Sequence, residues 1–326
     1  MNGRLEKELL AEKKMQEKLK ALPKIFSEYY IYLRAGKKTY TTINKYINYV
    51  VNFANSISQD KISDDFYKSV STADIEGYLI SLETREVDGQ LVRTGSDIQC
   101  ARWSGLNTFF EFLVKRDHIT TNPVAKTTRP KNNTEHTVTY LTKAEIKKIM
   151  NAIDKNKSPI TGVRDKTIVA LALSTGLRVD AITNINISDI NFEEKFIDVI
   201  EKGNKKRQIA IGDNMIELLT DWIKVRNDAF SDVDTSALFI SNKRVRITAE
   251  AVRDLVKKYA AQAGINKRIT PHKCRSSAAT NLAAAGVSIQ AIAQQLGHSS
   301  VSITQRYVDV LKEEKDKSTK ILDNLF

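Results

Sequence analysis

The sequence has little cysteine and histidine and no long apolar run. Its two cysteines, Cys100 and Cys274, are far apart, and none of its four histidines has the i, i+4 spacing of a helical metal site. This excludes a disulfide framework and predicts a cytoplasmic protein without a metal or other cofactor. No apolar stretch reaches the roughly 18 residues that span a bilayer, and residues 1–20 have no apolar signal region, so we expect neither membrane insertion nor export.

Positive charge is in excess. The 326 residues include 51 Lys and Arg against 39 Asp and Glu, giving a net charge of +12. Such a balance favours a polyanionic partner, with nucleic acid as the first candidate and an anionic membrane surface as the second. A lysine-rich composition can also be basic without binding DNA. A hydrophobic content of 41% over this length allows two cores, so we expect two domains.

Apolar residues repeat with a helical period from residue 22 to residue 122. This predicts an all-helical first domain over residues 22–122, preceded by a solvated helical extension over residues 1–21. Two segments place cations and hydroxyls just before a helix. Such residues are typical of a helix start that contacts phosphate, and equally of a surface loop with ordinary helix capping. Their candidate DNA contacts are Lys37, Lys38, Thr39, Tyr40, Thr41, Arg93 and Ser96.

A polar, aperiodic stretch with two prolines covers residues 123–138 and is typical of an interdomain linker. Its Lys126 and Arg129 are candidate DNA contacts, because a basic linker can lie along a phosphate backbone. A capping box formed by Thr142 and Glu145 then opens a helix, so the second domain is predicted over residues 139–326.

The second domain contains a predicted β-hairpin, with strands at residues 196–200 and 207–211 and Gly203-Asn204 in the turn. The fold class is therefore mainly α with a small β-sheet. Lys202 is predicted near the hairpin tip, where it is free to swing into a neighbouring site. Lys205 is a candidate DNA contact, although a solvated charge at the tip explains it as well.

A phosphate site is predicted at the helix that begins after Thr270. Thr270 suits the N-cap, Pro271 suits the first turn and Gly286 suits the end. His272 and Arg275 share one face of the first turn, where free backbone N–H groups and the helix dipole also favour an anion.

Three further residues are candidates for the same site. Arg178 follows a buried helix closed by Gly176, where a charge needs a partner unless it simply lies at the surface. His298 follows a helix that Ser288 caps and Gly297 ends. Tyr307, nine positions later on a short helical segment, is a candidate nucleophile.

The C-terminal tail after Tyr307 is charged and then apolar. It either folds back on its own domain or docks on a second copy.

These segments together resemble the tyrosine recombinase (phage integrase) family, in its Xer and simple integrase branch. The motifs are Thr175-Gly176-Leu177-Arg178, Glu201-Lys202-Gly203-Asn204-Lys205, His272-Lys273-Cys274-Arg275, Leu296-Gly297-His298 and Tyr307. The resemblance covers residues 139 to about 310 by motif, and residues 22–122 more loosely. It implies a two-domain clamp around duplex DNA, made of a helical core-binding domain and an α+β catalytic domain.

The resemblance also implies residue roles. Tyr307 would attack a DNA phosphodiester, leaving a 3'-phosphotyrosine and a free 5'-hydroxyl. Arg178 and Arg275 would hold the non-bridging oxygens, with His272 and His298 as further donors, and Lys202 would protonate the leaving oxygen. Guanidiniums that never lose their charge stabilise phosphoryl transfer without metal, and the covalent bond removes the need for ATP. A free tyrosine has a pKa of about 10, and the sequence leaves open which group removes its proton.

Three positions depart from the family pattern. Ala181 lies where Glu is frequent, Ser276 lies where His is frequent, and Cys274 replaces a usual Leu. Support of the active site by the residue at position 181 is therefore in doubt. Cys274 is a buried thiol or an oxidation sensor. None of the three changes removes a catalytic group.

We therefore predict a site-specific DNA recombinase for integration, excision or resolution, acting at the nucleoid in a prokaryotic cytoplasm. It would bind a double-stranded recombination site and assemble as a tetramer on DNA, with residues 312–326 as the candidate contact between copies. One alternative is a type IB topoisomerase-like enzyme that nicks and closes DNA at no fixed site. The other is a DNA-binding protein without catalysis, against which all six expected catalytic residues are present.

Overall fold

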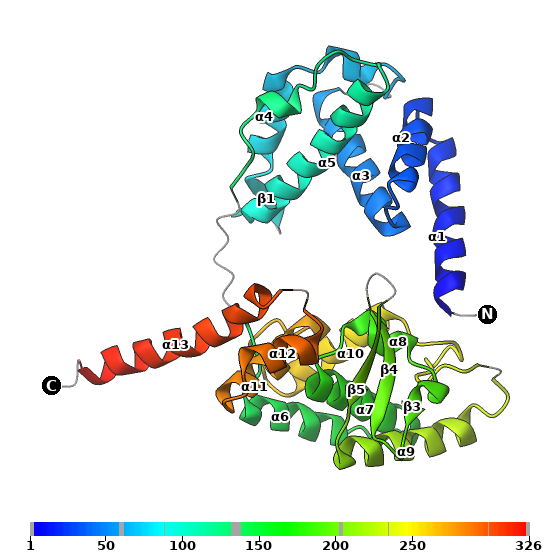
Figure 1. Cartoon of the computed structure of the whole chain (residues 1–326), viewed down its shortest axis with the longest axis vertical. Helices are drawn as coiled ribbons and strands as arrows, with labels where there is room; N and C mark the ends of the chain where they lie inside the picture. The colour runs from blue at the N-terminus through cyan, green and yellow to red at the C-terminus, as the bar shows by residue number, and fades with distance from the viewer. Residues whose placement is uncertain are drawn as a thin grey trace. The chain divides into compact units, whose positions relative to one another are not determined.

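The computed structural model describes residues 3–58, 62–87, 89–131, 138–201, 205–233, 235–298 and 300–323. The chain divides into two compact units, Met1–His136 and Thr137–Phe326, and this division falls inside the predicted linker. Each unit has its own hydrophobic core. Figure 1 shows the helices and strands of both units. The fold class is the predicted one, mainly helical with a small sheet in the second unit.

The first unit is built on an aromatic core. The ring of Phe109 lies 5.0 Å from that of Tyr29 and 6.0 Å from that of Phe26, centre to centre, and all three side chains are fully buried. These rings lie on helices that are distant in sequence, so their contact fixes how the helices pack. The helices are α1 (Gly3–Lys20), α2 (Lys24–Ala35), α3 (Tyr40–Ile57), α4 (Thr72–Ser81) and α5 (Ser96–Lys115), with 3-10 turns η1 (Phe66–Ser69) and η2 (Val124–Lys126).

The prediction that residues 1–21 form a solvated extension is wrong for the second half of α1. Met15 and Leu19, one turn apart, are buried in the core of the first unit. Lys18 between them donates from Nζ to Asn44 Oδ1 on α3 at 2.7 Å. Two apolar residues four positions apart are enough to attach a helix whose other faces are charged.

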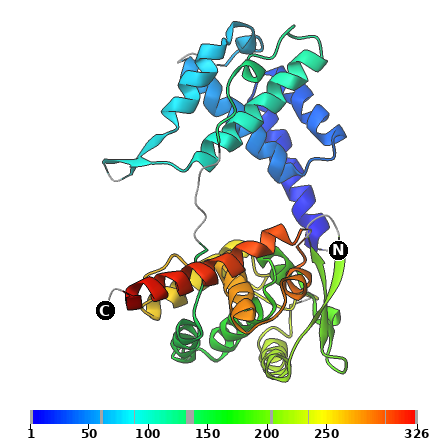
Figure 2. The same cartoon turned by 60° about the vertical axis from the view of Figure 1, so that its left-hand side comes forward.

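The first unit is also not entirely helical. Strands β1 (Thr84–Val87) and β2 (Gln90–Arg93) form an antiparallel hairpin between α4 and α5, and Figure 2 shows it extending away from the helices. The sequence carries the signal, since Asp88-Gly89 is a strong two-residue hairpin turn and Gly89 has a φ of +78°. Arg93 therefore ends a strand, and Gly95 is the N-cap of α5.

The first part of the predicted linker packs on α5. Val124 is fully buried in the core of the first unit, and Trp103 donates from Nε1 to Thr127 Oγ1 at 2.8 Å. The guanidinium of Arg129 lies 5.6 Å from the centre of the Trp103 ring. Residues 132–137 lie outside the described part of the chain.

The second unit contains the predicted hairpin. Strands β3 (Ile190–Asn191), β4 (Phe196–Glu201) and β5 (Lys205–Ala210) form an antiparallel sheet in that order, with Ile197 opposite Ile209 and Val199 opposite Arg207. Ile197, Val199 and Ile209 point into the core. The turn residues Gly203 and Asn204, and Lys202 with them, lie outside the described residues.

The helices of the second unit begin and end at residues that the sequence indicates. Thr142 and Glu145 form the capping box, and Thr270 accepts a hydrogen bond from the Lys273 N–H. Gly176 and Gly297 end their helices in the left-handed conformation. The helices are α6 (Lys143–Asp154), α7 (Pro159–Thr175), α8 (Val179–Asn184), α9 (Asp213–Ala229), α10 (Ala249–Gln262), α11 (Pro271–Ala284), α12 (Ile289–Leu296) and α13 (Ser302–Asp323), with a 3-10 turn η3 (Ile187–Asp189).

The segment that carries Tyr307 is longer than predicted. It is the start of α13, a single helix of 22 residues. Figure 1 shows the C-terminal part of α13 extending away from the other helices of the second unit. Within the described residues, this tail therefore does not fold back on its own unit.

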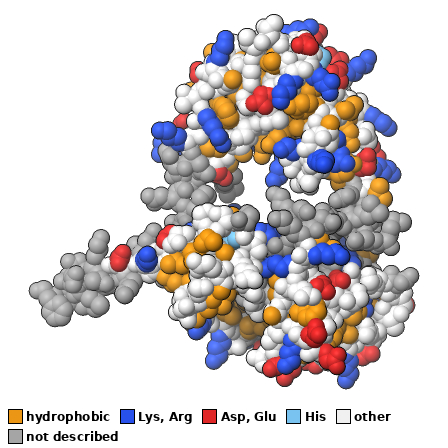
Figure 3. All heavy atoms as spheres, in the orientation of Figure 1, with side chains coloured by type: hydrophobic (Ala, Val, Ile, Leu, Met, Phe, Trp, Pro, Cys, Tyr) orange, Lys and Arg blue, Asp and Glu red, His pale blue; other side chains and the backbone are white. Residues whose placement is uncertain are grey.

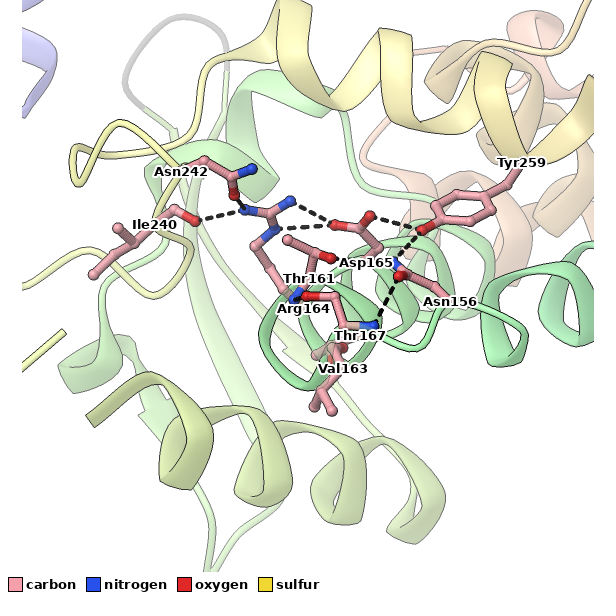
Figure 4. Close-up of polar contacts among 10 residues, drawn as sticks. Asn156, Thr161, Val163, Arg164, Asp165, Thr167, Ile240, Asn242 and Tyr259 are labelled. Carbon is pink, nitrogen blue, oxygen red and sulfur yellow. Dashed lines mark hydrogen bonds and ion pairs between the residues drawn. The ribbon is translucent and has the colours of Figure 1, made fainter. Parts of the chain in front are cut away.

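A buried polar network fixes α7 in the second unit (Figure 4). Arg164 and Asp165 form an ion pair with a shortest N–O distance of 2.8 Å, and Tyr259 on α10 donates to Asp165 Oδ2 at 2.9 Å. Burial and then the Asp165 carboxylate raise the pKa of Tyr259 to about 12. The remaining hydrogen bonds come from Arg164 to the Ile240 carbonyl and Asn242, and from Asn156 to Tyr259 and Thr161. The helix that leads to Gly176 is thereby held in place.

Candidate active site

Arg275 lies at the meeting point of three helices. It projects from the first turn of α11 and is 2% exposed. Its Nη1 donates to the Gly176 carbonyl at the end of α7 at 2.8 Å, and its Nη2 donates to the Leu296 carbonyl at the end of α12 at 2.5 Å. Carbonyls at helix ends carry partial negative charge, so they stabilise the buried guanidinium.

Gly176 allows this close packing. Its φ is +63°, and a Cβ atom added there would lie 2.5 Å from Leu296 Cδ2 and 3.4 Å from Ala278 Cβ. A larger residue would therefore force the Leu296 side chain to shift and would be strained at this positive φ. Two positions later, Arg178 is the N-cap residue of α8 and is exposed.

Both predicted histidines lie in the field of these arginines. Burial, and then the charges of Arg275, Arg178 and Arg306, lower the pKa of His298 to about 4. Burial and then Arg306 are the largest causes that lower the pKa of His272. Each imidazole is therefore neutral at pH 7 and offers one N–H donor and one acceptor nitrogen.

His298 has a buried partner on the next helix. Its Nδ1 lies 2.7 Å from Oγ1 of Thr304, whose side chain is fully buried. If the threonine hydroxyl donates to Nδ1, the proton of the neutral ring is on Nε2, which is then the donor toward a phosphate oxygen. Sequence reasoning missed Thr304, because only the turn between α12 and α13 brings it to the histidine.

Tyr307 lies next to His298 and is fully buried. The two rings are nearly parallel, with centres 6.3 Å apart and planes 18° apart. The tyrosine packs in a small apolar cluster with Ala279, Ile292 and Leu296. A DNA phosphate can reach its hydroxyl only after some of these covering groups move.

Arg306 is a further cation at this site that sequence reasoning missed. Its Nη2 donates to Tyr307 Oη at 3.2 Å, and its guanidinium carbon lies 5.1 Å from the centre of the Tyr307 ring. The sequence signal was available, because an arginine directly precedes the candidate nucleophile. What the sequence does not reveal is that the side chain turns back onto the phenol.

The predicted general acid Lys202 lies outside the described residues, but the hairpin that carries it is anchored. Arg207 on β5 donates from Nη1 to the carbonyls of Gln294 (3.0 Å) and Gln295 (2.6 Å) on α12. These bonds tie β5 to the helix that precedes His298.

The candidate DNA contacts in the first unit lie at three loops. Thr39 is the N-cap of α3, and the Arg34 guanidinium lies 4.3 Å from the centre of the Tyr40 ring. The side chains of Lys37, Lys38, Thr39, Thr41, Arg93, Lys126 and Arg129 are exposed, and those of Tyr40 and Ser96 are half-buried. Lys205 begins β5, and its side chain lies outside the description.

The three departures from the family pattern are all buried residues. Ala181 is 4% exposed and belongs to the core of the second unit. Ser276 donates from Oγ to the His272 carbonyl at 3.2 Å. Burial raises the pKa of the Cys274 thiol to about 12, so it is protonated and unreactive.

Within the described ranges, no three His, Cys, Asp or Glu residues lie close enough together to hold a metal ion. No helix in the same ranges is long and apolar enough to cross a membrane.

Residues 139–314 match the model of the phage integrase family. The chain belongs to this family. A relative from Staphylococcus epidermidis, tyrosine recombinase XerD, supports the family assignment. It is 30% identical over 294 residues, and the alignment covers 89% of this chain and 95% of the relative. The chain is thus a tyrosine recombinase of the Xer and integrase type.

Two solved structures of phage integrase type share the fold. The XerH site-specific recombinase bound to palindromic difH substrate has a TM-score of 0.70 and 20% identity, with 87% of this chain and 81% of that chain covered. A lambda integrase tetramer bound to a Holliday junction has a TM-score of 0.63 and 18% identity, with 86% and 76% covered. Both likenesses confirm the two-domain recombinase architecture.

Proposed function

We propose that this recombinase cuts and rejoins duplex DNA at a specific site through a 3'-phosphotyrosine. Tyr307 is the nucleophile, and Arg178 and Arg275 bind the non-bridging oxygens of the scissile phosphate. His272 and His298 donate further hydrogen bonds from their neutral rings. Lys202, which lies between β4 and β5 in the sequence, is the general acid. The substrate class is double-stranded DNA, and the setting is integration, excision or resolution of DNA at the nucleoid of a prokaryotic cell.

The reaction is a transesterification, in which each phosphoester bond that breaks is replaced by a new one. The Tyr307 oxygen forms a bond to phosphorus as the bond from phosphorus to the 5'-oxygen breaks, and Lys202 supplies a proton to that leaving oxygen. Negative charge on the phosphoryl oxygens is met by guanidinium donors, which stay charged at all relevant pH values. The reverse step with another 5'-hydroxyl restores the tyrosine and needs neither a metal nor ATP.

The observation that carries this proposal is a cluster of cationic side chains beside one buried tyrosine. His272 and Arg275 lie on α11, His298 follows α12 and Arg178 precedes α8, and burial and then the charges of nearby arginines lower the pKa of both histidines. Like charges repel, so a fold gathers them only where an anion balances them. A phosphate next to the Tyr307 hydroxyl is such an anion.

The burial of Tyr307 supports an order of events in which copies of the chain assemble on DNA before the DNA is cleaved. Movement of α13 would expose the hydroxyl, and the part of α13 that extends away could then bind a second copy through residues 312–326. Four copies exchange two duplexes, as expected for a symmetric complex. The lambda integrase tetramer on a Holliday junction is an assembly of this kind.

Charge distribution supports a defined DNA-binding face on the second unit. Figure 3 shows acidic side chains gathered over the region of β3, β4 and α9. Asp189, Glu193 and Asp198 lie together there. These carboxylates would repel phosphates, so DNA is expected at the catalytic cations. The loops at residues 37–41, 93–96 and 126–129 of the first unit would add phosphate contacts.

The proposal is tested by incubating the protein with supercoiled DNA from its own genomic neighbourhood in EDTA. We expect the wild type to become covalently attached to 3' ends and to join defined sites, whereas Tyr307→Phe does neither. Tyr140→Phe is the matched control, because Tyr140 packs against the same apolar cluster, and we expect it to retain activity.

Three other outcomes would change the conclusion. Relaxation without defined junctions would favour the topoisomerase-like alternative. Equal adduct formation by wild type and Tyr307→Phe would show that another residue is the nucleophile, and absence of any adduct would favour a DNA-binding protein without catalysis.

A further inference from the structure

We propose that Arg306 is an additional catalytic residue, which contacts the attacking oxygen of Tyr307 and stabilises the negative charge that develops on it. This inference rests on the proposed function of Tyr307 as the nucleophile. It addresses a step for which the sequence offered no group, the activation of the tyrosine.

The geometry of Arg306 is specific to the nucleophile. Adjacent residues on a helix normally point in different directions, yet Arg306 Nη2 lies 3.2 Å from Tyr307 Oη. The guanidinium also lies over the phenol ring, with its carbon 5.1 Å from the ring centre. A hydrogen bond from a cation is stronger to a phenolate than to a phenol, so this contact strengthens as the proton leaves.

The guanidinium has donor capacity left. Among the described residues, Nε of Arg306 is buried without a hydrogen-bond partner. A buried donor without a partner is unfavourable, and it is relieved if a ligand supplies the acceptor. A non-bridging oxygen of the phosphate that Tyr307 attacks would be such an acceptor, since phosphate oxygens bind guanidinium forks well.

Within the described residues, the titratable groups on which Arg306 acts are His272 and Lys273 on α11 and His298 after α12. Arg275 on α11 and Arg178 before α8 act on the same two histidines. Arg306 lowers the pKa of Lys273 as well as that of both histidines, so its charge is felt across the site. During attack the phenolic proton passes to solvent, and the O–P bond to Tyr307 forms as the bond from phosphorus to the 5'-oxygen breaks. The leaving 5'-oxygen takes a proton from the general acid, and the cation at Nη2 faces the tyrosine oxygen that has lost its own.

The test measures single-turnover cleavage of a nicked duplex that carries the mapped recombination site, as a function of pH. We expect Arg306→Gln to form the 3' adduct about 100-fold more slowly than wild type at pH 7, comparable to the loss of one oxyanion donor. The deficit should shrink as the pH rises toward 10, because hydroxide then removes the phenolic proton without help. Methylguanidinium in solution should partly restore Arg306→Ala.

Gln305→Ala is the matched control, because Gln305 is exposed on the same turn of α13 and its amide contacts only Asp309 among the described residues. A rate for Arg306→Gln within twofold of wild type would overturn the inference and leave the proposed function intact. A deficit that is equal at every pH, together with a lower melting temperature and no rescue, would show a structural role and also overturn it. Failure of wild type itself to form an adduct would remove the proposed function and this inference together.

Discussion

Two groups of buried polar residues in the second unit differ in how their charges are arranged. Around Asp165, opposite charges meet, and the carboxylate accepts hydrogen bonds from Arg164 and Tyr259. Around Arg275, positive groups gather, and the guanidinium donates to backbone carbonyls at two helix ends. The first arrangement stabilises a fold, whereas the second is a repulsive cluster that a phosphate would relieve.

Burial alone does not separate the two groups. Arg164 is 7% exposed and Arg275 is 2% exposed. Their partners differ, because a carboxylate carries a full charge and a carbonyl carries a partial one. The charge of Arg275 therefore still acts on His298 and His272. In this fold, a buried arginine that lowers the pKa of neighbouring histidines is a better indicator of a catalytic site than a buried arginine in an ion pair.

The largest expected effect on stability comes from breaking the network. Asp165→Ala leaves the Arg164 charge buried without its carboxylate, and we expect a loss of about 3–5 kcal/mol in the free energy of unfolding. Denaturant unfolding of the full chain, followed by the fluorescence of the buried Trp222 in the second unit, measures it. Asp213→Ala is the control, because Asp213 pairs with Lys195 at the surface, where a pair contributes about 0–1 kcal/mol. Equal losses in the two variants would contradict the role of the network.

Breaking the site should reduce activity more than stability. Arg275→Gln keeps an amide donor but removes the charge, and we expect cleavage to slow by about 100-fold to 1000-fold. Arg226→Gln is the matched control, since Arg226 is equally buried and donates to the Ala237 and Thr235 carbonyls away from the site. Similar cleavage rates for the two variants, per folded molecule, would show that the charge at position 275 has no catalytic role.

Thr304 offers a smaller test of the same site. Thr304→Val has nearly the same shape but no hydroxyl, so Nδ1 of His298 loses its partner and the ring can take the other tautomer. Loss of this positioning contact should slow cleavage by about 10-fold, and Thr304→Ser should recover most of the rate. Failure of serine to restore activity that valine lacks would mean that packing, rather than the hydroxyl, matters at this position.

The smallest effect concerns pH. The pKa of His298 is about 4 in the folded chain, below its ordinary value of 6.5, so the unfolded chain binds more protons between these values. The stability associated with neutral His298 is therefore complete above pH 6.5 and is lost as the pH falls toward 4. His272 contributes with the same sign, because its pKa is lowered as well. Melting temperatures at pH 7 and pH 5 should differ less for His298→Gln than for wild type, and an unchanged difference would contradict the environment described for His298.

Much of the fold could be predicted where the signal is local. The capping box at Thr142 and Glu145, the Thr270-Pro271 helix start and the left-handed stops at Gly176 and Gly297 depend on a few adjacent residues. The β4–β5 hairpin follows from alternation around a turn. The β1–β2 hairpin was missed although Asp88-Gly89 indicates it, because the helical period on both sides suggested one continuous bundle.

The arrangement of the active site was only partly predictable. Residue types and their order identified Arg178, His272, Arg275, His298 and Tyr307 as candidates through a family resemblance. The burial of Tyr307, the bond from Thr304 to His298 and the contact of Arg306 with the phenol depend on how α11, α12 and α13 pack.

The sequence by itself therefore determined the kinds of groups this protein brings to a phosphate and the helices that carry them, because caps, turns and side-chain chemistry act over a few residues. Only the tertiary structure decided which of those groups touch, which are buried and which charges act on which neighbours. These properties depend on distances between residues far apart in the chain, as with Arg275 and the carbonyls of Gly176 and Leu296. A linear sequence does not contain those distances until the helices have packed.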